Sequence, residues 1–285
     1  MPLPDLPLET ADDTVTCTAS LHGLLPHRPF DAHKNQFGRV GIVAGSRGFA
    51  GAATMCTWGA LRGGAGLVEV FVPENIYEIV AAAAPFESMV KPVKSYRDLV
   101  EEKIDVWGIG PGLGKDNATE IIELIQRTEN PMVVDADALN IISANVSILK
   151  NCRGPRLLTP HPGEMKRLAG AQRISRAELA RKFTSEFPVT LLLKGSRTVV
   201  AEGGKRISYN TTGNPGMATG GMGDVLTGVC AALLAQNLSA FDAARLAAWA
   251  CGRAAELALF NNGETEQSLL PRDVLTNLGR AFREL

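Results

Sequence analysis

Short apolar runs alternate along the chain with longer segments whose apolar residues recur at helical spacing. The runs are rich in Val, Ile and Leu, which is typical of strands buried on both faces of a parallel sheet. We expect strands within 38–46, at 67–72, 105–109, 131–134, 156–159 and 189–193, and as a hairpin at 198–201 and 206–209. We expect helices that end near 61, 84, 128 and 170, and further helices at about 175–186, 219–235, 241–260 and 271–282.

Strands that alternate with helices predict right-handed βαβ units and a mostly parallel central sheet with helices on both faces. This pattern places the chain in the α/β class. No linker and no internal repeat divides it, so we expect one domain over residues 37–285. Residues 1–36 are polar, contain prolines and lack a clear period, and we expect an arm that wraps the domain or pairs with another subunit.

The glycine-rich segment 210–224 stands directly before one of the expected helices. That helix has an apolar face made by Met222, Val225, Leu226, Val229, Cys230, Leu233 and Leu234. Its first N–H groups lack helical partners and the helix dipole is positive there, so this end favours an anion such as phosphate. Asp224 falls in the first turn, where an acid also stabilises a helix without any ligand. We favour a phosphate site, because ordering so many glycines costs much conformational entropy.

The composition restricts the possible partners and location. A net charge of −1 over 285 residues, without a Lys/Arg-rich run, argues against nucleic acid as the main partner. No apolar run reaches the ~18 residues of a membrane helix, and the first residues do not resemble a secretory signal. The five cysteines are dispersed without metal-ligand spacing, which suits a reducing compartment. We therefore expect a cytoplasmic protein.

Chemically distinctive residues follow most of the expected strands. In open α/β sheets, ligands bind beyond the carboxyl ends of the strands, which is where these segments stand. They are Gly45-Ser46 with Gly51-Ala52-Ala53, the segment 110–114, Asp135 with Asp137, Thr159–Glu164, Lys194–Arg197 and the loop 213–224. Their convergence predicts a ligand-binding edge more firmly than any one of them does.

Several of these residues admit a second explanation. His161 stands between two prolines and either contacts a ligand or packs in a local turn. Lys194 either neutralises phosphate or ends its strand in solvent, and for both residues we favour the ligand. Asp135 and Asp137 either hold a hydrated Mg²⁺ near phosphates, or Asp137 caps the helix that follows, and both alternatives stay open.

Two common nucleotide-binding motifs are only partly present. The segment 110–114 lacks the third glycine of GxGxxG and contains a proline, which disfavours an NAD-dependent dehydrogenase. The lysine of GxxxxGK[ST] is also missing, which disfavours a P-loop enzyme.

Together the motifs strongly resemble the signatures of the NAD(P)H-hydrate dehydratases, a family of the ribokinase-like superfamily. The resemblance rests on 214–228 above all, and also on 158–165, 134–140, 110–114, 38–40, 44–46 and 62–68. It covers about residues 30–280 in the right order. It implies a ribokinase-like three-layer sandwich with a mostly parallel central sheet.

The resemblance implies repair of a damaged nicotinamide coenzyme. Members of the family dehydrate (6S)-NADHX or NADPHX, the hydrated coenzymes, to NADH or NADPH and consume a nucleotide. The Thr159–Glu164 sequence resembles the ADP-dependent type, which yields AMP and phosphate through phosphorylation of the C6 hydroxyl and elimination. ADP is then the co-substrate, with Mg²⁺ at its phosphates. Relatives are often homotetramers, and because the arm is too short for an epimerase domain, we expect a separate epimerase to supply the S epimer.

Family roles carry over to the matching residues of this sequence. Asp224 is the expected base, and the N–H groups of Gly221, Met222 and Gly223 are expected to stabilise the transferring phosphoryl group. The nucleotide is expected to contact Lys194, Gly195, Ser196, Arg197, Thr198 and Gly223. The hydrated nicotinamide is expected to contact Gly51, Ala52, Ala53, Gly112, Leu113, Gly114, His161 and Asp224.

Two other functions share part of this pattern. A ribokinase-like kinase of a vitamin precursor, of the hydroxyethylthiazole or hydroxymethylpyrimidine kinase type, has the same glycine-rich helix start but releases a stable phosphorylated product. A nucleotide-binding sensor keeps the pocket without turnover. Asp224 argues against the sensor, because a protein that only binds phosphates gains nothing from a carboxylate beside them.

Overall fold

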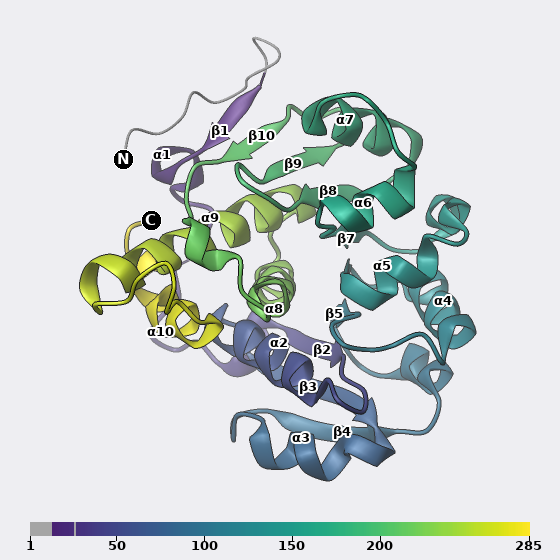
Figure 1. Ribbon diagram of the computed structural model, residues 1–285. Coiled ribbons are helices and arrows are strands. Elements are labelled where there is room, and N and C mark those ends of the chain that lie inside the picture. Colours follow the sequence, from purple (N-terminus) through teal and green to yellow (C-terminus); the bar gives the residue numbers. More distant parts are fainter. Residues whose placement is uncertain (1–12, 26) are drawn as a thin grey trace.

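The computed structural model describes residues 13–25 and 27–285, and every structural statement below concerns these residues. They form one ten-stranded sheet with helices packed on both of its faces (Figure 1). The expected α/β three-layer architecture is therefore confirmed. No helix in this part of the chain is long and apolar enough to cross a bilayer.

The sheet has the strand order β1-β10-β9-β8-β7-β6-β5-β2-β3-β4. The strands are β1 Thr14–Thr16, β2 Arg39–Val43, β3 Leu67–Pro73, β4 Met89–Val93, β5 Val106–Ile109, β6 Met132–Val134, β7 Arg156–Leu158, β8 Thr190–Leu193, β9 Val199–Glu202 and β10 Ser208–Asn210. Neighbours are parallel except at β9, which runs antiparallel to both β8 and β10, and its pairing with β10 is the predicted hairpin.

The expected helices occur in the expected order, and α1 in the arm is a further helix that the sequence did not predict. The helices are α1 Thr18–Leu21, α2 Ala50–Arg62, α3 Tyr77–Ala83, α4 Ala118–Arg127, α5 Ala136–Ile142, α6 Pro162–Ala169, α7 Arg176–Glu186, α8 Met222–Ala235, α9 Ala240–Asn261 and α10 Pro271–Phe282. Short 3-10 turns occupy Lys34–Phe37, Glu74–Ile76, Tyr96–Glu101, Val146–Asn151 and Pro215–Met217.

The sheet separates two apolar cores, because successive side chains of a strand point to opposite faces. Val133 and Leu157 belong to the core shared with α2, α8, α9 and α10. Their neighbours Val134 and Leu158 belong to the core shared with α4, α5, α6 and α7. Both faces of the central strands are therefore buried, which explains why these strands appear in the sequence as continuous apolar runs.

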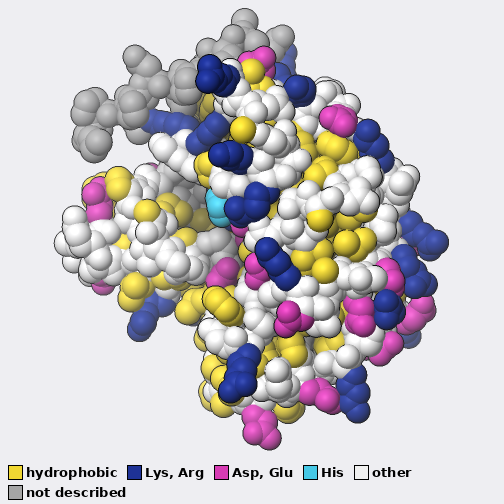
Figure 2. Space-filling view, turned by 45° about the vertical axis from the view of Figure 1, so that its right-hand side comes forward, with side chains coloured by type: hydrophobic (Ala, Val, Ile, Leu, Met, Phe, Trp, Pro, Cys, Tyr) yellow, Lys and Arg dark blue, Asp and Glu magenta, His cyan; other side chains and the backbone are white. Residues whose placement is uncertain are grey.

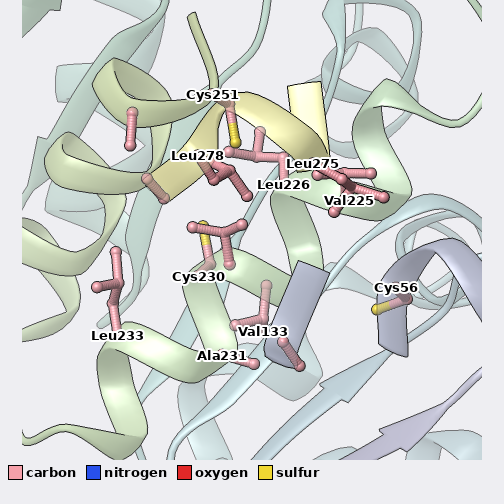
Figure 3. Packing of buried hydrophobic residues seen from close by; sticks show 14 of the residues in the cluster. Cys56, Val133, Val225, Leu226, Cys230, Ala231, Leu233, Cys251, Leu275 and Leu278 are labelled. Atoms are coloured by element: carbon pink, nitrogen blue, oxygen red, sulfur yellow. The ribbon is translucent and has the colours of Figure 1, made fainter. Parts of the chain in front are cut away.

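Helix α8 is buried on all sides, although its sequence predicts a single apolar face. Every residue from Val225 to Ala235 is buried, and the helix packs against α2, α9 and the sheet (Figure 3). The prediction counted only large apolar residues, whereas small residues such as Gly228 and Ala231 cover the remaining surface of the helix. Gly228 permits the contact with α2, because a Cβ there would lie 2.0 Å from the carbonyl oxygen of Cys56.

Gly228→Ala is expected to destabilise the fold by about 1–3 kcal/mol, because α2 would have to move away from α8. Gly279→Ala is the matched control, since Gly279 also lies inside a helix but has open space at its Cβ position. The control should gain up to ~1 kcal/mol from helix propensity. Urea unfolding measures both changes, and a Gly228→Ala protein as stable as the wild type would contradict this close contact.

The two strands that the sequence did not predict, β1 and β4, form the edges of the sheet. In β4, Lys91 and Pro92 interrupt the apolar pattern, as is common in edge strands. In the arm, β1 lies parallel to β10, with Thr16 Oγ1 2.7 Å from Ser208 Oγ. Through β1 the arm thus contacts the domain, and the two roles expected for the whole arm, wrapping the domain or pairing with another subunit, stay predictions. Residues 1–12 and 26 of the arm lie outside the described residues. The boundary between the arm and the domain at residue 36 stays a prediction.

Candidate active site

The carboxyl ends of the central strands β2, β5, β6 and β7 lie side by side along one side of the sheet, where the strands end. Val43, Ile109, Val134 and Leu158 are consecutive partners in the strand pairing at this edge. The loops that follow these four strands contain four of the distinctive segments named above, and the segments 194–197 and 213–224 follow β8 and β10. The predicted convergence of these loops is thus present in the described chain, and the binding of a ligand there stays a prediction.

The glycine-rich loop ends at Gly221, which is the N-cap of α8. Its φ of +93° is a backbone conformation that residues with a Cβ rarely adopt. No side-chain hydrogen bond caps the helix there, and the Met222 N–H makes only a long contact of 3.5 Å to the carbonyl of Thr219, so the first turn keeps its partial positive charge for another partner. Asp224 lies in this first turn, as the sequence predicts.

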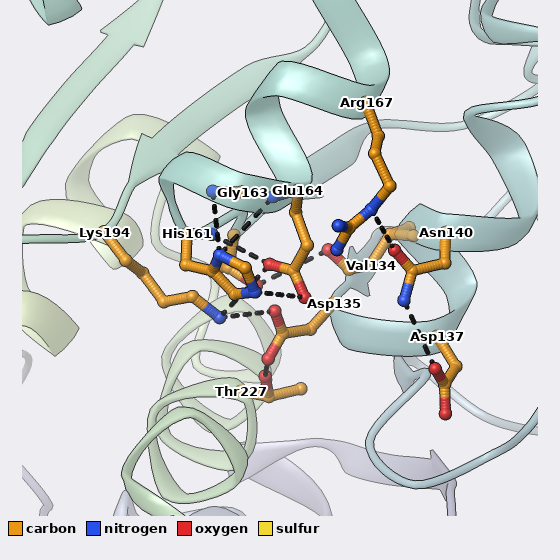
Figure 4. Close-up of polar contacts among 11 residues, drawn as sticks. Val134, Asp135, Asp137, Asn140, His161, Gly163, Glu164, Arg167, Lys194 and Thr227 are labelled. Carbon is orange, nitrogen blue, oxygen red and sulfur yellow. Dashed lines mark hydrogen bonds and ion pairs between the residues drawn. The ribbon is translucent and has the colours of Figure 1, made fainter. Parts of the chain in front are cut away.

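Lys194 brings a positive charge to the same turn of α8. Its Nζ lies 2.7 Å from Asp135 Oδ1 and 3.9 Å from Glu164 Oε2 (Figure 4). A Cβ on Gly223 would lie 3.4 Å from this Nζ, so the missing side chain leaves the ammonium against the helix backbone. Burial lowers the pKa of Lys194, but the two carboxylates raise it, and the net direction is upward. Only 19% of the side chain is exposed, so the alternative that Lys194 ends its strand in solvent is wrong.

Asp135 and Asp137 point to different partners. Asp135 is buried and accepts hydrogen bonds from Lys194 on Oδ1 and from Thr227 Oγ1, at 2.8 Å, on Oδ2. Asp137 Oδ2 accepts the backbone N–H of Gly114 at 2.9 Å. Residues 13–25 and 27–285 contain no cluster of three His, Cys, Asp or Glu side chains suited to a metal ion. The cap by Asp137 is wrong, since Asp135 occupies the N-cap position of α5, whereas a hydrated Mg²⁺ held by the two aspartates stays a prediction.

The environment of Asp224 makes its carboxylate a stronger base than an ordinary aspartate side chain. Burial and the Asp135 carboxylate raise its pKa to about 6, against the opposing effect of the Lys194 ammonium. A group that titrates near the working pH accepts a proton effectively and is still mostly ionised at neutral pH.

Two loops that precede α2 and α4 are joined by hydrogen bonds. Gly45 N–H donates to the carbonyl of Pro111 at 2.8 Å, and Ser46 Oγ donates to the carbonyl of Gly112 at 2.7 Å. Gly112, at φ +61°, lies so close to α2 that a Cβ would come within 2.9 Å of Ala52 Cβ. The structure therefore brings the predicted segments 51–53 and 112–114 together. Within them, the side chains of Ala53 and Leu113 are buried in the cores and do not face solvent.

A hollow of about 580 Å³ opens beside the start of α2. Its lining residues are Arg47, Gly48, Ala50, Gly51, Asn75, Ile76 and Ile79. Among them only Gly51 was expected at a ligand site. On the face shown in Figure 2, acidic and basic side chains are interspersed, and a histidine lies at the edge of a recess.

His161 is the N-cap residue of α6. Its Nδ1 accepts the backbone N–H of Gly163 at 3.0 Å, and its own N–H donates to Glu164 Oε2 at 2.8 Å. Half of the side chain is exposed, with Nε2 3.3 Å from Glu164 Oε1. The local turn packing considered for His161 is therefore present, and its contact with a ligand stays a prediction.

The segment 194–198 forms a tight turn between β8 and β9. Gly195 and Arg197 have positive φ values of +139° and +57°, and Thr198 Oγ1 donates to the carbonyl of Gly195 at 3.1 Å. Arg176 of α7 donates to the carbonyl of Arg197 and holds the turn from behind. Ser196 is exposed at the tip of the turn.

Sequence reasoning missed two residues of this site, Thr227 and Arg176. Thr227 is one turn beyond Asp224 on α8, so helical spacing could have placed it on the same side. Arg176 has no comparable signal, because its place beside the turn depends on how α7 packs.

The fold and the site define the class of this protein. A mostly parallel sheet with helices on both faces, whose glycine-rich helix start carries a carboxylate beside a largely buried lysine, is an α/β fold of the ribokinase-like class. Residues 40–278 match the sequence profile of NAD(P)H-hydrate dehydratase. The chain belongs to this family.

Curated relatives support the same assignment. The chain is 41% identical over 278 residues to the bifunctional NAD(P)H-hydrate repair enzyme Nnr of Moorella thermoacetica, covering 92% of this chain and 52% of that protein. It thus spans about half the length of this relative. It is 36% identical over 239 residues to the ADP-dependent (S)-NAD(P)H-hydrate dehydratase of Neisseria meningitidis, covering 81% of this chain and 80% of that protein.

Solved structures show the same fold. The ADP/ATP-dependent NAD(P)H-hydrate dehydratase of Bacillus subtilis, co-crystallised with ATP/Mg²⁺, matches with a TM-score of 0.85 and 27% identity. The match covers 96% of this chain and 99% of that one. A hydroxyethylthiazole kinase of Pyrococcus horikoshii matches with a TM-score of 0.61 at 16% identity, which shows the fold alone.

Proposed function

We propose that this chain catalyses the ADP-dependent dehydration of (6S)-NADHX and NADPHX to NADH and NADPH. The observation that carries the proposal is the Asp224 carboxylate in the first turn of α8, beside the Lys194 ammonium and the uncapped N–H groups of that turn. The carboxylate suits a hydroxyl that must lose a proton, and the positive groups suit the phosphates of a nucleotide. Family membership supports this chemistry over that of other ribokinase-like enzymes.

The reaction has two parts. The C6 hydroxyl oxygen of the hydrate forms a bond to the β-phosphorus of ADP, the bond from this phosphorus to the bridging oxygen breaks, and AMP leaves while Asp224 accepts the hydroxyl proton. The C6–O bond of the resulting ester then breaks, phosphate leaves with the bond electrons, and loss of a C5 proton restores the ring double bond. Phosphorylation is needed because phosphate is a much better leaving group than hydroxide.

The described residues support each role in the first step. In a loose phosphoryl-transfer transition state the hydroxyl proton leaves late, so the position of Asp224 matters more than its basicity. The N–H groups of Gly221, Met222 and Gly223 and the Lys194 ammonium stabilise the charge on the transferring group. The structure offers no carboxylate cage for Mg²⁺ among the described residues, so we infer that the ion enters with the nucleotide, held mainly by phosphate oxygens.

The remaining contacts are proposed from position. The turn 194–198 is the nucleotide site, in line with its tight backbone and exposed tip. The segments 51–53 and 112–114, with His161, form the site of the hydrated nicotinamide, to which Ala53 and Leu113 contribute backbone only. The homotetramer, the cytoplasmic location and a separate epimerase stay predictions.

The test is to incubate the protein with (6S)-NADHX and either ADP or ATP, and to follow restored dihydronicotinamide absorbance and released phosphate. We expect restoration with ADP, with AMP and phosphate formed in equal amounts. A stable phosphorylated vitamin precursor in place of restoration would favour the kinase. Tight nucleotide binding without turnover would favour the sensor.

The pH dependence of turnover is a further prediction. A carboxylate base is inactive when protonated, so kcat/KM for the hydrate should fall as the pH drops through the pKa of Asp224, about 6. Activity should be nearly constant from there to about pH 8. A profile that stays flat down to pH 4.5, measured with a protein shown to remain folded, would contradict the assignment of Asp224.

A further inference from the structure

Asp135 lies behind the proposed catalytic groups and connects three elements of the fold. It follows β6, and its side chain is 2% exposed. One oxygen holds Lys194, which follows β8, and the other accepts from Thr227, which lies within α8 (Figure 4). The carboxylate therefore joins the end of β8 to the helix that carries Asp224.

The backbone fixes Asp135 firmly in this place. Its N–H donates to the carbonyl of Ile109 at 3.0 Å. Its own carbonyl lies so near Gly110 that a Cβ on that glycine would come within 1.9 Å of the oxygen. The next residue, Ala136, has a φ of +49°, which residues with a Cβ rarely adopt and which tends to occur at functional sites.

Lys194, in contrast, has a long and flexible side chain. Without a fixed partner its ammonium would reach toward water, because a charged head group prefers solvent to a buried position. Two carboxylates oppose this tendency, and Asp135 is the nearer one, at 2.7 Å against 3.9 Å for Glu164. The position of the ammonium beside Gly223 thus depends mainly on Asp135.

We propose that Asp135 is a positioning residue that, itself oriented by Thr227, holds the Lys194 ammonium against the first turn of α8 for the nucleotide phosphates. Asp135 contacts no phosphate in this arrangement, because both of its oxygens are occupied by protein donors. The proposal rests on the function proposed above, since it concerns the same nucleotide site.

The proposal predicts a distinctive effect of charge. The charged groups around Asp224 are Asp135, Lys194 and, through Lys194, Glu164 of α6, and the titratable thiol of Cys56 of α2 also interacts with it. Removing the Asp135 charge lowers the pKa of Asp224 by more than the withdrawal of the Lys194 ammonium raises it, because Asp135 has the larger effect of the two. Turnover should therefore fall while the acidic limb of the pH profile moves to lower pH.

Asp135→Asn tests the charge and keeps the size of the side chain. We expect kcat for (6S)-NADHX with ADP to fall on the order of 10–10²-fold, as for a misplaced catalytic group. We expect AMP, titrated calorimetrically, to bind on the order of tenfold more weakly, as for a lost charge-assisted hydrogen bond. The acidic limb should move below its wild-type position near pH 6. Asp98→Asn, at an exposed position, is the control and should match the wild type.

Thr227 tests the orientation of Asp135 without changing any charge. Thr227→Val keeps the shape but removes the donor to Asp135 Oδ2, so turnover and AMP affinity should fall while the acidic limb stays near pH 6. Thr227→Ser keeps the hydroxyl and should restore both values. A loss that Thr227→Ser does not restore, in a protein with the wild-type unfolding temperature, would overturn the role of Thr227.

Other outcomes would overturn the proposal as a whole. One is an Asp135→Asn protein with wild-type AMP affinity and an unmoved acidic limb. Another is a loss of activity that only follows the fraction of unfolded protein. If the wild type fails to restore NADH, the proposed function fails, whereas AMP binding by the same variants still decides whether Asp135 positions Lys194.

Discussion

Asp224→Asn is expected to lower kcat for the hydrate by about 10²- to 10⁴-fold, the range of a lost general base. The amide keeps the size of the side chain but does not accept the hydroxyl proton. Lys194 and the N–H groups of the first turn of α8 remain, so the KM for ADP should change little. Wild-type turnover by this variant would refute the proposed mechanism.

The same substitution should make the protein more stable at neutral pH. Burial raises the pKa of Asp224 from 3.8 to about 6 on folding, so the ionised form is disfavoured in the folded state. This penalty is absent below pH 3.8, grows as the pH rises, and is complete above about pH 6. Asp224→Asn removes it and should raise the free energy of unfolding at pH 7 by about 1–3 kcal/mol. Urea titrations at pH 4.5 and 7 measure this difference.

Asp242→Asn is the control for the helix dipole. Asp242 also lies in the first turn of a helix, α9, where its backbone N–H is capped by Ser239. Its loss should leave turnover unchanged and lower stability by about 0.3–1 kcal/mol. The opposite signs of the two stability changes would distinguish a carboxylate kept for chemistry from one that stabilises its helix.

Local patterns made much of this site predictable. The glycines before α8 and the acid in its first turn predict an anion site because a helix start has the same properties in any fold. The carboxyl ends of parallel strands share one edge, so the order of strands and helices in the sequence is enough to place the loops after β2, β5, β6 and β7 together.

Contacts between distant segments were not predictable in this way. The sequence suggested for Asp135 only a metal site shared with Asp137, and nothing near it in the sequence identifies Lys194, which lies 59 residues further on, as its partner. For a similar reason, the sequence predicted only one buried face for α8, whereas the helix is buried on all sides. Small residues such as Gly228 appear neutral in the sequence, and only the packing of α2 shows that they are buried.

Arg156 is the clearest residue of this kind, because a sequence offers no sign that an arginine in a strand is buried. It is 1% exposed at the start of β7. Its guanidinium donates to the carbonyl groups of Ile125 and Thr128 at the end of α4, and of Asn130 and Pro155 in the adjoining loops. One side chain thus satisfies carbonyl groups that the helix end leaves without partners.

Arg156→Met is expected to lower the free energy of unfolding by more than about 3 kcal/mol. Replacing a buried ion pair by apolar residues is often harmless, because both charges are removed together. Here only the donor is removed, and each buried carbonyl left without a partner costs about 1–3 kcal/mol. Arg153→Met is the matched control, since Arg153 is 63% exposed and lies 4.0 Å from Glu129, and its loss should cost less than about 1 kcal/mol. Arg156 is the first residue of β7, and the active site lies beyond the opposite, carboxyl end of this strand. The kcat per folded molecule should therefore match the wild type. A variant that unfolds at the wild-type urea concentration would contradict the role given to this guanidinium.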